Sequence, residues 1–202
     1  MSEDIWDLAD FFTQSCNPAV REVETKMVIH KFTIENEIDE VAALLDSKSD
    51  FGSHATKITD FLFLSGATPA VTDAFLRVCD IRHIITLIDL NNVIKSVRRT
   101  TKRLQIRHTS IKIVDVGTES LTEAFAVVFP ILQAAEENKK AVLIHCAMGI
   151  SRSASMVIMF LMKSRNWRFD QTLAYVENLR KQVNPNKGFK DQMIQFEKQL
   201  LN

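Results

Sequence analysis

Four short apolar runs, separated by segments with helical signals, constrain the fold of this chain most strongly. The runs cover 61–64, 83–89, 109–114 and 141–145, and they are typical of strands buried in a sheet. Helices are expected between and after them, at about 69–78, 120–137, 153–163, 170–182 and 188–201. Strands that alternate with helices predict an α/β domain with a central, mostly parallel sheet flanked by helices. Ligands bind beyond the carboxyl ends of the strands in such sheets.

Several helices have specific signals at their ends or inside them. Pro69 stands where the first position of a helix is expected, a place that favours proline. Ser120 and Glu123 form a capping box, so Ser120 is expected to be the N-cap of its helix. Pro130 lies inside that helix and should kink it. A short amphipathic helix is also predicted at 38–46.

Charge is distributed unevenly along the 202 residues, although the net charge is zero. Residues 1–50 contain twelve acidic and four basic residues, whereas 51–202 carry a net charge of +8. We expect an acidic N-terminal extension over 1–37 and one folded domain over 38–202. The basic domain suits an anionic substrate, while overall neutrality gives no reason to expect nucleic acid.

The N-terminal sequence, the apolar runs and the cysteines together predict an intracellular protein, cytoplasmic or nuclear. The N-terminus is acidic where a signal peptide needs basic residues, and no apolar run reaches the roughly eighteen residues of a membrane span. The cysteines are odd in number and irregular in spacing, which predicts neither a disulfide framework nor a zinc site; they are Cys16, Cys79 and Cys146. Three histidines also lack ligand spacing, so no metal or other cofactor is expected; they are His54, His83 and His108.

The segment 145–152 carries the strongest functional signal. A strand there runs through a short loop directly into a helix, so the loop N–H groups can converge on an anion at the helix N-terminus. Gly149 lies in the middle of the loop, where an unusual backbone angle is needed. A thiol at Cys146 would have its pKa lowered by these dipoles and by Arg152. Arg152 can also hold two oxygens of a phosphate. The alternative is that Cys146 is a small buried apolar residue.

The pattern His-Cys-x5-Arg at 145–152 resembles the signature loop of the protein tyrosine phosphatase superfamily. More narrowly, about 38–201 resembles the small, atypical dual-specificity phosphatases. The segment 180–189 is similar to the Arg-Pro-x3-Pro-Asn-x-Gly-Phe motif of that family, with Lys181 where proline is usual. The resemblance implies a phosphatase catalytic domain over 38–202.

The resemblance also implies roles for individual residues. Cys146 would attack phosphorus and form a cysteinyl-phosphate, Arg152 would bind the phosphate, and Ser151 would help the thiolate to leave. His145 would orient the loop and tune the cysteine, with Ser153 in a supporting position. The substrate phosphate would be bound by the loop residues Ala147, Met148, Gly149, Ile150, Ser151 and Arg152.

The proton donor is also taken from the resemblance. A phosphate monoester releases its alcohol or phenol more readily when the leaving oxygen is protonated. The segment 111–121 matches the one in which these phosphatases carry their acid, which assigns the role to Asp115. The alternative is that Asp115 is a solvated turn residue.

The expected substrate is a phosphoprotein, phosphorylated on tyrosine, serine or threonine, and a protein kinase is one candidate. Alternatives are a phosphoinositide or RNA 5′-triphosphate phosphatase, or a silent module that only binds phosphopeptides. The resemblance also suggests a regulatory disulfide between Cys79 and Cys146 as a possibility. The run 95–108 contains six basic and no acidic residues. It could recruit an acidic partner or a second phosphate, or be a solvated loop or edge strand.

Overall fold

A five-stranded sheet organises residues 54–200, the part of the chain that the computed structural model describes. Its strands are β1 (Ala55–Lys57), β2 (Leu62–Ser65), β3 (Ile81–Leu87), β4 (Arg107–Ile111) and β5 (Ala141–His145). Their order is β1-β2-β5-β3-β4, and only β1 is antiparallel to its neighbour. The predicted α/β fold with a mostly parallel sheet is confirmed. The extension predicted over 1–37 and the helix predicted at 38–46 lie outside the described residues.

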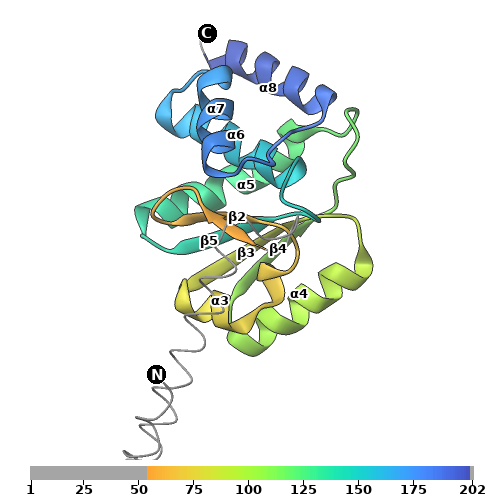
Figure 1. Cartoon of the computed structure of the whole chain (residues 1–202), viewed down its shortest axis with the longest axis vertical. Helices are drawn as coiled ribbons and strands as arrows, with labels where there is room; N and C mark the ends of the chain where they lie inside the picture. The colour runs from red at the N-terminus through yellow and green to blue at the C-terminus, as the bar shows by residue number, and fades with distance from the viewer. Residues whose placement is uncertain (1–53, 201–202) are drawn as a thin grey trace, which may run out of the picture. The chain divides into compact units, whose positions relative to one another are not determined.

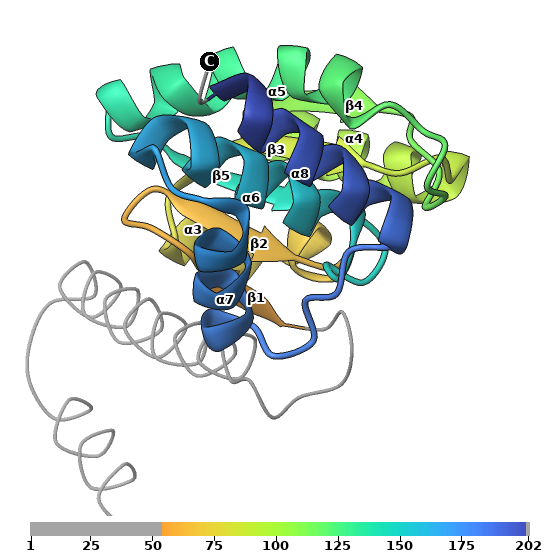
Figure 2. The same ribbon diagram turned by 90° about the horizontal axis from the view of Figure 1, so that it is seen from above.

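Helices cover both faces of the sheet (Figure 1). They are η1 (Pro69–Val71), α3 (Asp73–Val78), α4 (Asn91–Leu104), α5 (Leu121–Glu137), α6 (Arg152–Arg165), α7 (Phe169–Leu179) and α8 (Lys187–Leu200). Helices α5 to α8 lie on one face, and α3 and α4 lie on the other. Figure 2 shows α6 surrounded by the other helices of its layer, and α6 accordingly has the most buried sequence among the helices described.

Alternating side chains of the strands divide the core into two clusters. Val142 and Ile144 of β5 pack with α5 and α6, whereas Leu143 packs with α3 and α4. Apolar residues on both sides of a strand are expected where helices cover both faces. The methionines at 156, 159 and 162 are buried in the first cluster.

The expected helix over 69–78 is interrupted, which corrects the sequence prediction. Thr72 adopts an extended backbone (φ −92°, ψ 107°) between η1 and α3. Its hydroxyl donates a hydrogen bond to the Thr68 carbonyl (2.9 Å), and such side-chain bonds compete with helix continuation. The capping prediction at α5 is confirmed, because Ser120 Oγ accepts a hydrogen bond from the Glu123 N–H (3.2 Å).

The basic run at 95–108 is mostly helical, and its assignment to a loop or edge strand was wrong for residues before 105. Helix α4 contains ten of these residues, and the edge strand β4 begins only at Arg107. The sequence pattern did not indicate this helix because its buried face has few apolar residues. Cations separate Ile94, Val97 and Thr101 along the sequence. Gln105 ends the helix in a left-handed conformation (φ 57°).

None of the helices within residues 54–200 combines the length and apolar character required to cross a bilayer.

Candidate active site

Cys146 follows the last residue of β5, and Arg152 begins α6, so the loop between them lies at the carboxyl edge of the sheet. A cleft of about 680 Å³ opens above this loop. The side chains that line it come from the loop, from the β4–α5 connection and from the α7–α8 connection; they are Asp115, Cys146, Ala147, Met148, Ile150, Ser151, Arg152, Asn184, Pro185, Asn186, Lys187 and Lys190. Five of the six predicted phosphate-binding residues line the cleft, and Gly149 lies behind it.

The carbonyl groups of the loop are bonded away from the cleft. Their partners are His145 Nδ1 for Cys146, the Ala67 N–H for Ala147, Arg180 for Met148 and Gly149, the Asn184 N–H for Ile150, and the Ser155 N–H for Ser151. Because each carbonyl is satisfied behind the loop, the N–H groups of successive peptides can converge on the front. This arrangement is suited to binding an anion such as phosphate.

The Cys146 sulfur lies at the floor of the cleft and accepts two hydrogen bonds. The donors are the Gly149 N–H and the Ser153 hydroxyl, each 3.2 Å from Sγ. Burial by itself would raise the pKa of the Cys146 thiol, but hydrogen bonds from Ser153 and Gly149 and the charge of Arg152 outweigh it. The pKa is therefore lowered, which favours the nucleophilic thiolate.

Gly149 is required by its backbone conformation and by a close contact. Its φ is +70°, and a Cβ at this position would lie 2.5 Å from the Ser65 carbonyl carbon. The loop can therefore pack against the end of β2 only with glycine at this position.

Arg152 lies over the loop with its guanidinium partly buried. Its Nη1 donates to the Ile113 carbonyl (3.4 Å), and its Nε lies 3.5 Å from Asp115 Oδ2. The Nε has no hydrogen-bond acceptor within residues 54–200. Because Arg152 also lines the cleft, its guanidinium is placed to bind an anion there.

Asp115 is brought to the cleft, as its predicted role requires. Its Oδ1 accepts hydrogen bonds from the Ser151 hydroxyl (2.7 Å) and from Asn186 Nδ2 (2.9 Å). Both bonds go to Oδ1, while Oδ2 faces Arg152 Nε (3.5 Å). The alternative interpretation of Asp115 as a purely solvated turn residue does not fit these contacts.

A glycine pair holds the segment that carries Asp115 against α8. A Cβ on Gly117 would lie 2.8 Å from the Cα of Gly188, and a Cβ on Gly188 would lie 2.3 Å from the Cα of Gly117. Gln192 strengthens the contact because its Nε2 donates to the carbonyls of Gly117 and Glu119. The position of Asp115 therefore depends on α8.

The two serines that flank Arg152 differ from their predicted roles. Ser151, expected to assist the departing thiolate, makes no hydrogen bond to the Cys146 sulfur. Its hydroxyl donates to Asp115 and accepts from the Asn186 N–H (3.1 Å). Ser153, expected only in support, contacts the sulfur because it lies in the first turn of α6, directly behind Cys146.

His145 is fully buried and connects the loop to the neighbouring strands. Its Nδ1 donates to the Cys146 carbonyl (3.0 Å), so in the neutral ring Nε2 accepts from the Thr86 hydroxyl (2.8 Å). Thr86 Oγ1 in turn accepts from His108 Nε2 (2.9 Å). Burial lowers the pKa of His145 to about 4, so the ring is neutral. The predicted orienting role of His145 is consistent with these bonds.

Arg180 supports the loop from beneath and was not predicted as a site residue. It is 1% exposed, and it donates to the carbonyls of Gly149 (2.9 Å), Met148 (3.0 Å) and His54 (3.3 Å) and to the Thr56 hydroxyl (3.2 Å). Burial lowers its pKa to about 10, although the negative charge on Cys146 opposes the shift. At neutral pH it remains a cation below the phosphate loop.

Cys79 lies too far from Cys146 to form the disulfide that the superfamily resemblance raised. Cys79 precedes β3, whose first residue pairs with Ala141, whereas Cys146 follows the other end of β5. The length of β5 separates them by about 16 Å, because a strand rises about 3.3 Å per residue. A disulfide requires Cα atoms within about 7 Å, and both thiols are free.

Several residues with contacts in the site were not singled out from the sequence, among them Arg180, Asn186, Thr86 and His108. Arg180 and Asn186 lie in the segment 180–189, so the family resemblance offered a signal for them. Thr86 and His108 lie in ordinary strands, and only the register of β3 and β4 brings them to His145. No metal-binding group of three or more His, Cys, Asp or Glu side chains occurs in the described part of the chain.

Comparisons with known proteins match most of the described chain. Residues 62–199 match the family model of the dual specificity phosphatase catalytic domain. The chain is 29% identical to Dual specificity protein phosphatase 1B of Arabidopsis thaliana over 149 residues, which cover 74% of this chain and 85% of that protein. It is 29% identical to Dual specificity protein phosphatase 5 of Homo sapiens over 147 residues, which cover 72% of this chain. The match spans only 36% of the human protein's length.

A solved structure has the same fold. The human tyrosine phosphatase-like serine/threonine/tyrosine-interacting protein superposes with a TM-score of 0.66 and 26% sequence identity. The match covers 73% of this chain and 98% of the human one.

Proposed function

This chain belongs to the dual specificity phosphatase catalytic-domain family, and we propose that it removes phosphate from tyrosine, serine and threonine residues of proteins through a cysteinyl-phosphate intermediate. Membership of this family assigns the chain to the protein phosphatases. The observation that carries the proposed mechanism is the Cys146 sulfur, which lies at the floor of an anion-binding loop with a lowered pKa. Two donors contact the sulfur, and Arg152 stands beside it.

In the first step the Cys146 thiolate attacks phosphorus, and the bond from phosphorus to the leaving oxygen breaks. The loop N–H groups and Arg152 stabilise the charge on the other phosphate oxygens. Asp115 protonates the leaving oxygen.

In the second step water attacks the cysteinyl-phosphate, and the sulfur leaves as a thiolate. Asp115, now ionised, takes the proton from the water. The negative charge returns to the sulfur, where the Ser153 hydroxyl and the Gly149 N–H stabilise it. Ser151 instead positions Asp115 through its hydrogen bond.

The mechanism is tested by hydrolysis of a small aryl phosphate under reducing conditions. Cys146→Ser and Arg152→Lys are expected to lose activity, and Asp115→Asn is expected to slow turnover by about 100-fold, a usual loss for a general acid. Cys79→Ser and Asp89→Asn are matched controls outside the cleft and should retain full activity. A wild type that binds phosphate but hydrolyses no monoester would instead support a silent phosphate-binding module.

The substrate class is tested separately with matched phosphopeptides, a phosphoinositide and an RNA 5′-triphosphate. The loop side chains at 147, 148 and 150 are uncharged, so they offer no additional cations for an inositol phosphate. We expect phosphotyrosine, phosphoserine and phosphothreonine peptides to be hydrolysed, and phosphorylated protein kinases belong in the same panel. Inert peptides beside a hydrolysed lipid or RNA end would contradict the protein substrate while leaving the mechanism intact.

A further inference from the structure

Helix α4 presents a stripe of four cations to solvent, which we call the α4 stripe. Its members are exposed and none has an ion-pair partner within residues 54–200; they are Lys95, Arg98, Arg99 and Lys102. Because each residue of a helix turns by about 100°, these four positions fall within an arc of roughly 100°. The helix contains no acidic residue to neutralise them.

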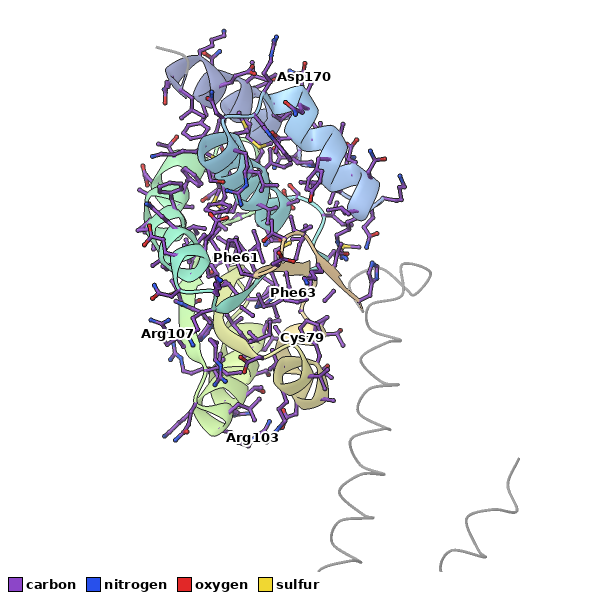
Figure 3. All side chains as sticks on the ribbon, turned by 90° about the vertical axis from the view of Figure 1, so that its left-hand side faces the viewer. Phe61, Phe63, Cys79, Arg103, Arg107 and Asp170 are labelled. Carbon is purple, nitrogen blue, oxygen red and sulfur yellow. The ribbon has the colours of Figure 1, made fainter. Side chains whose placement is uncertain are left out.

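Several other cations of the described residues are paired, unlike the four of the α4 stripe. Arg103 binds Asp73 of α3 with both terminal nitrogens. Arg82 binds Asp80 (2.5 Å), and Lys112 binds Asp89 (3.3 Å). Figure 3 shows Arg103 on the α3–α4 layer, on the opposite side of the sheet from Asp170 in α7. The α4 stripe is therefore a group of four cations, unpaired within the described residues, on one face of one helix.

The fold of α4 does not require the stripe. Its buried face consists of Ile94, Val97, Thr100 and Thr101, which are sufficient to attach the helix to the sheet. Like charges three or four residues apart repel each other, and this repulsion weakens a helix. The stripe contains four such pairs, and all four side chains are exposed, which favours a role in binding.

We propose that the α4 stripe binds an acidic segment of a partner protein. From Lys95 to Lys102 the stripe extends about 10 Å, at 1.5 Å per residue. An extended peptide covers this length with about three residues, so two or three closely spaced Asp or Glu side chains can meet the four cations. This surface is separate from the cleft, and the proposal does not rest on the proposed function.

Two other polyanions fit the surface less well. Residues 91–107 contain no aromatic side chain on which nucleic acid bases could stack. A membrane-binding amphipathic helix inserts its apolar face, but the apolar face of α4 is buried in the core. An acidic protein segment requires only the charged face.

The test uses the full chain and a fluorescent peptide of alternating Glu and Ser residues, with binding followed by anisotropy. Arg98→Glu combined with Lys102→Glu should weaken binding by roughly tenfold or more, because two attractions become repulsions. Lys181→Glu combined with Lys198→Glu makes the same change in net charge at exposed positions outside α4 and should leave binding nearly unchanged. Hydrolysis of the small aryl phosphate, if the wild type shows it, should be equal in all three proteins.

Three outcomes would overturn the proposal. The first is equal weakening by both double variants, which would indicate a net-charge effect. The second is a wild type that fails to bind the acidic peptide at about 50 mM salt, where screening is weak. The third is binding of single-stranded RNA or anionic lipid vesicles, but not of the peptide, in a manner that depends on Arg98 and Lys102. Circular dichroism of each variant controls for folding.

Discussion

The phosphate loop and helix α4 both concentrate positive charge, but they hold it in opposite ways. Arg180 beneath the loop is 1% exposed, and four acceptors fix its guanidinium. Arg98 and Arg99 on α4 are exposed and have no ion-pair partner among the described residues. The loop has buried, oriented charge, whereas α4 has solvent-exposed charge.

This difference between buried and exposed cations suits two different functions, stabilising a reacting group and attracting a binding partner. Oriented charge in a buried site stabilises a developing charge without reorganisation, which is what a reacting phosphate requires. Solvated charge is screened by salt and acts on the approach of a partner. Changes at the loop should therefore cost stability and activity regardless of salt, while changes at α4 should alter binding in a salt-dependent way.

The largest effect is expected from Arg180→Met. The variant leaves the carbonyls of Met148 and Gly149 without their buried donor, and removal of one member of a buried charged network typically costs about 3 kcal/mol. We expect the free energy of unfolding in urea to fall by that amount, and kcat/KM for an aryl phosphate to fall by at least 100-fold, roughly the loss that misplacement of a catalytic group can cause.

Arg99→Met is the matched control for this comparison, because it removes the same side chain from α4. It should change the unfolding free energy by no more than about 0.5 kcal/mol and leave kcat/KM nearly unchanged. If Arg180→Met were as stable and active as Arg99→Met, the buried cation would not be supporting the loop.

The pH dependence of stability should also separate the two regions. Burial lowers the pKa of both His145 and His83 to about 4, below the unfolded value of about 6.5. The folded protein therefore favours the neutral rings. Their stabilisation is fully present above pH 6.5 and is lost as the pH falls towards 4, by up to about 3 kcal/mol for each histidine.

Urea unfolding between pH 7 and pH 4 measures this loss. His83→Gln keeps a group that can bond to Thr109, the present partner of His83. This variant should lose less unfolding free energy than the wild type between pH 7 and pH 4. Lys95→Gln with Lys102→Gln, which leaves Arg98 in place, should keep the wild-type decline. A His83→Gln profile parallel to that of the wild type would show that burial of this ring does not govern acid stability.

A smaller effect on catalysis is expected from Gly117→Ala. The new Cβ would lie 2.8 Å from the Cα of Gly188, so the segment carrying Asp115 must move away from α8. We expect kcat to fall by about tenfold, a moderate part of a general acid's contribution, while inhibition by inorganic phosphate stays close to wild type. Thr118→Ala, an exposed position in the same segment, is the control.

A combined variant distinguishes displacement of Asp115 from a general loss of structure. If Gly117→Ala acts through Asp115, it should add little to the defect of Asp115→Asn. Fully multiplicative defects would show that the glycine contact serves something other than the proton donor.

The sequence predicted the parts of the site that are local in the chain. The strand, loop and helix around Cys146 are contiguous, so their order alone places the thiol at the carboxyl edge beside a helix N-terminus. The N-cap at Ser120 is equally local, because it depends on a residue three positions away. Asp115 required the family resemblance, since nothing in its own neighbourhood distinguishes it from other acids.

The remaining features depend on tertiary packing. Ser151 and Ser153 both flank Arg152, and only the start of α6 at Arg152 decides which hydroxyl faces the sulfur. The bond from Arg180 to the loop joins residues 31 positions apart. Helix α4 was missed because its cations outnumber the few apolar residues that attach it to the sheet.

The smallest effect is expected from Arg99→Gln, and its sign is opposite to that of the loop variants. Arg99 has Lys95, Lys102 and Arg103 as like-charged neighbours at helical spacing, so its removal relieves repulsion. We expect the free energy of unfolding to rise by about 0.5 kcal/mol at low salt and the gain to disappear near 1 M salt, where the Debye length is about 3 Å.

Arg103→Gln provides the contrast within the same helix. It removes the ion pair with Asp73, so it should lower stability slightly. Changes of opposite sign in the unfolding free energy for Arg99→Gln and Arg103→Gln would show that some cations of α4 stabilise the fold and others do not. If Arg99→Gln also destabilised the protein, the stripe would contribute to the stability of α4. The stripe and the phosphate loop would then differ only in how exposed their cations are.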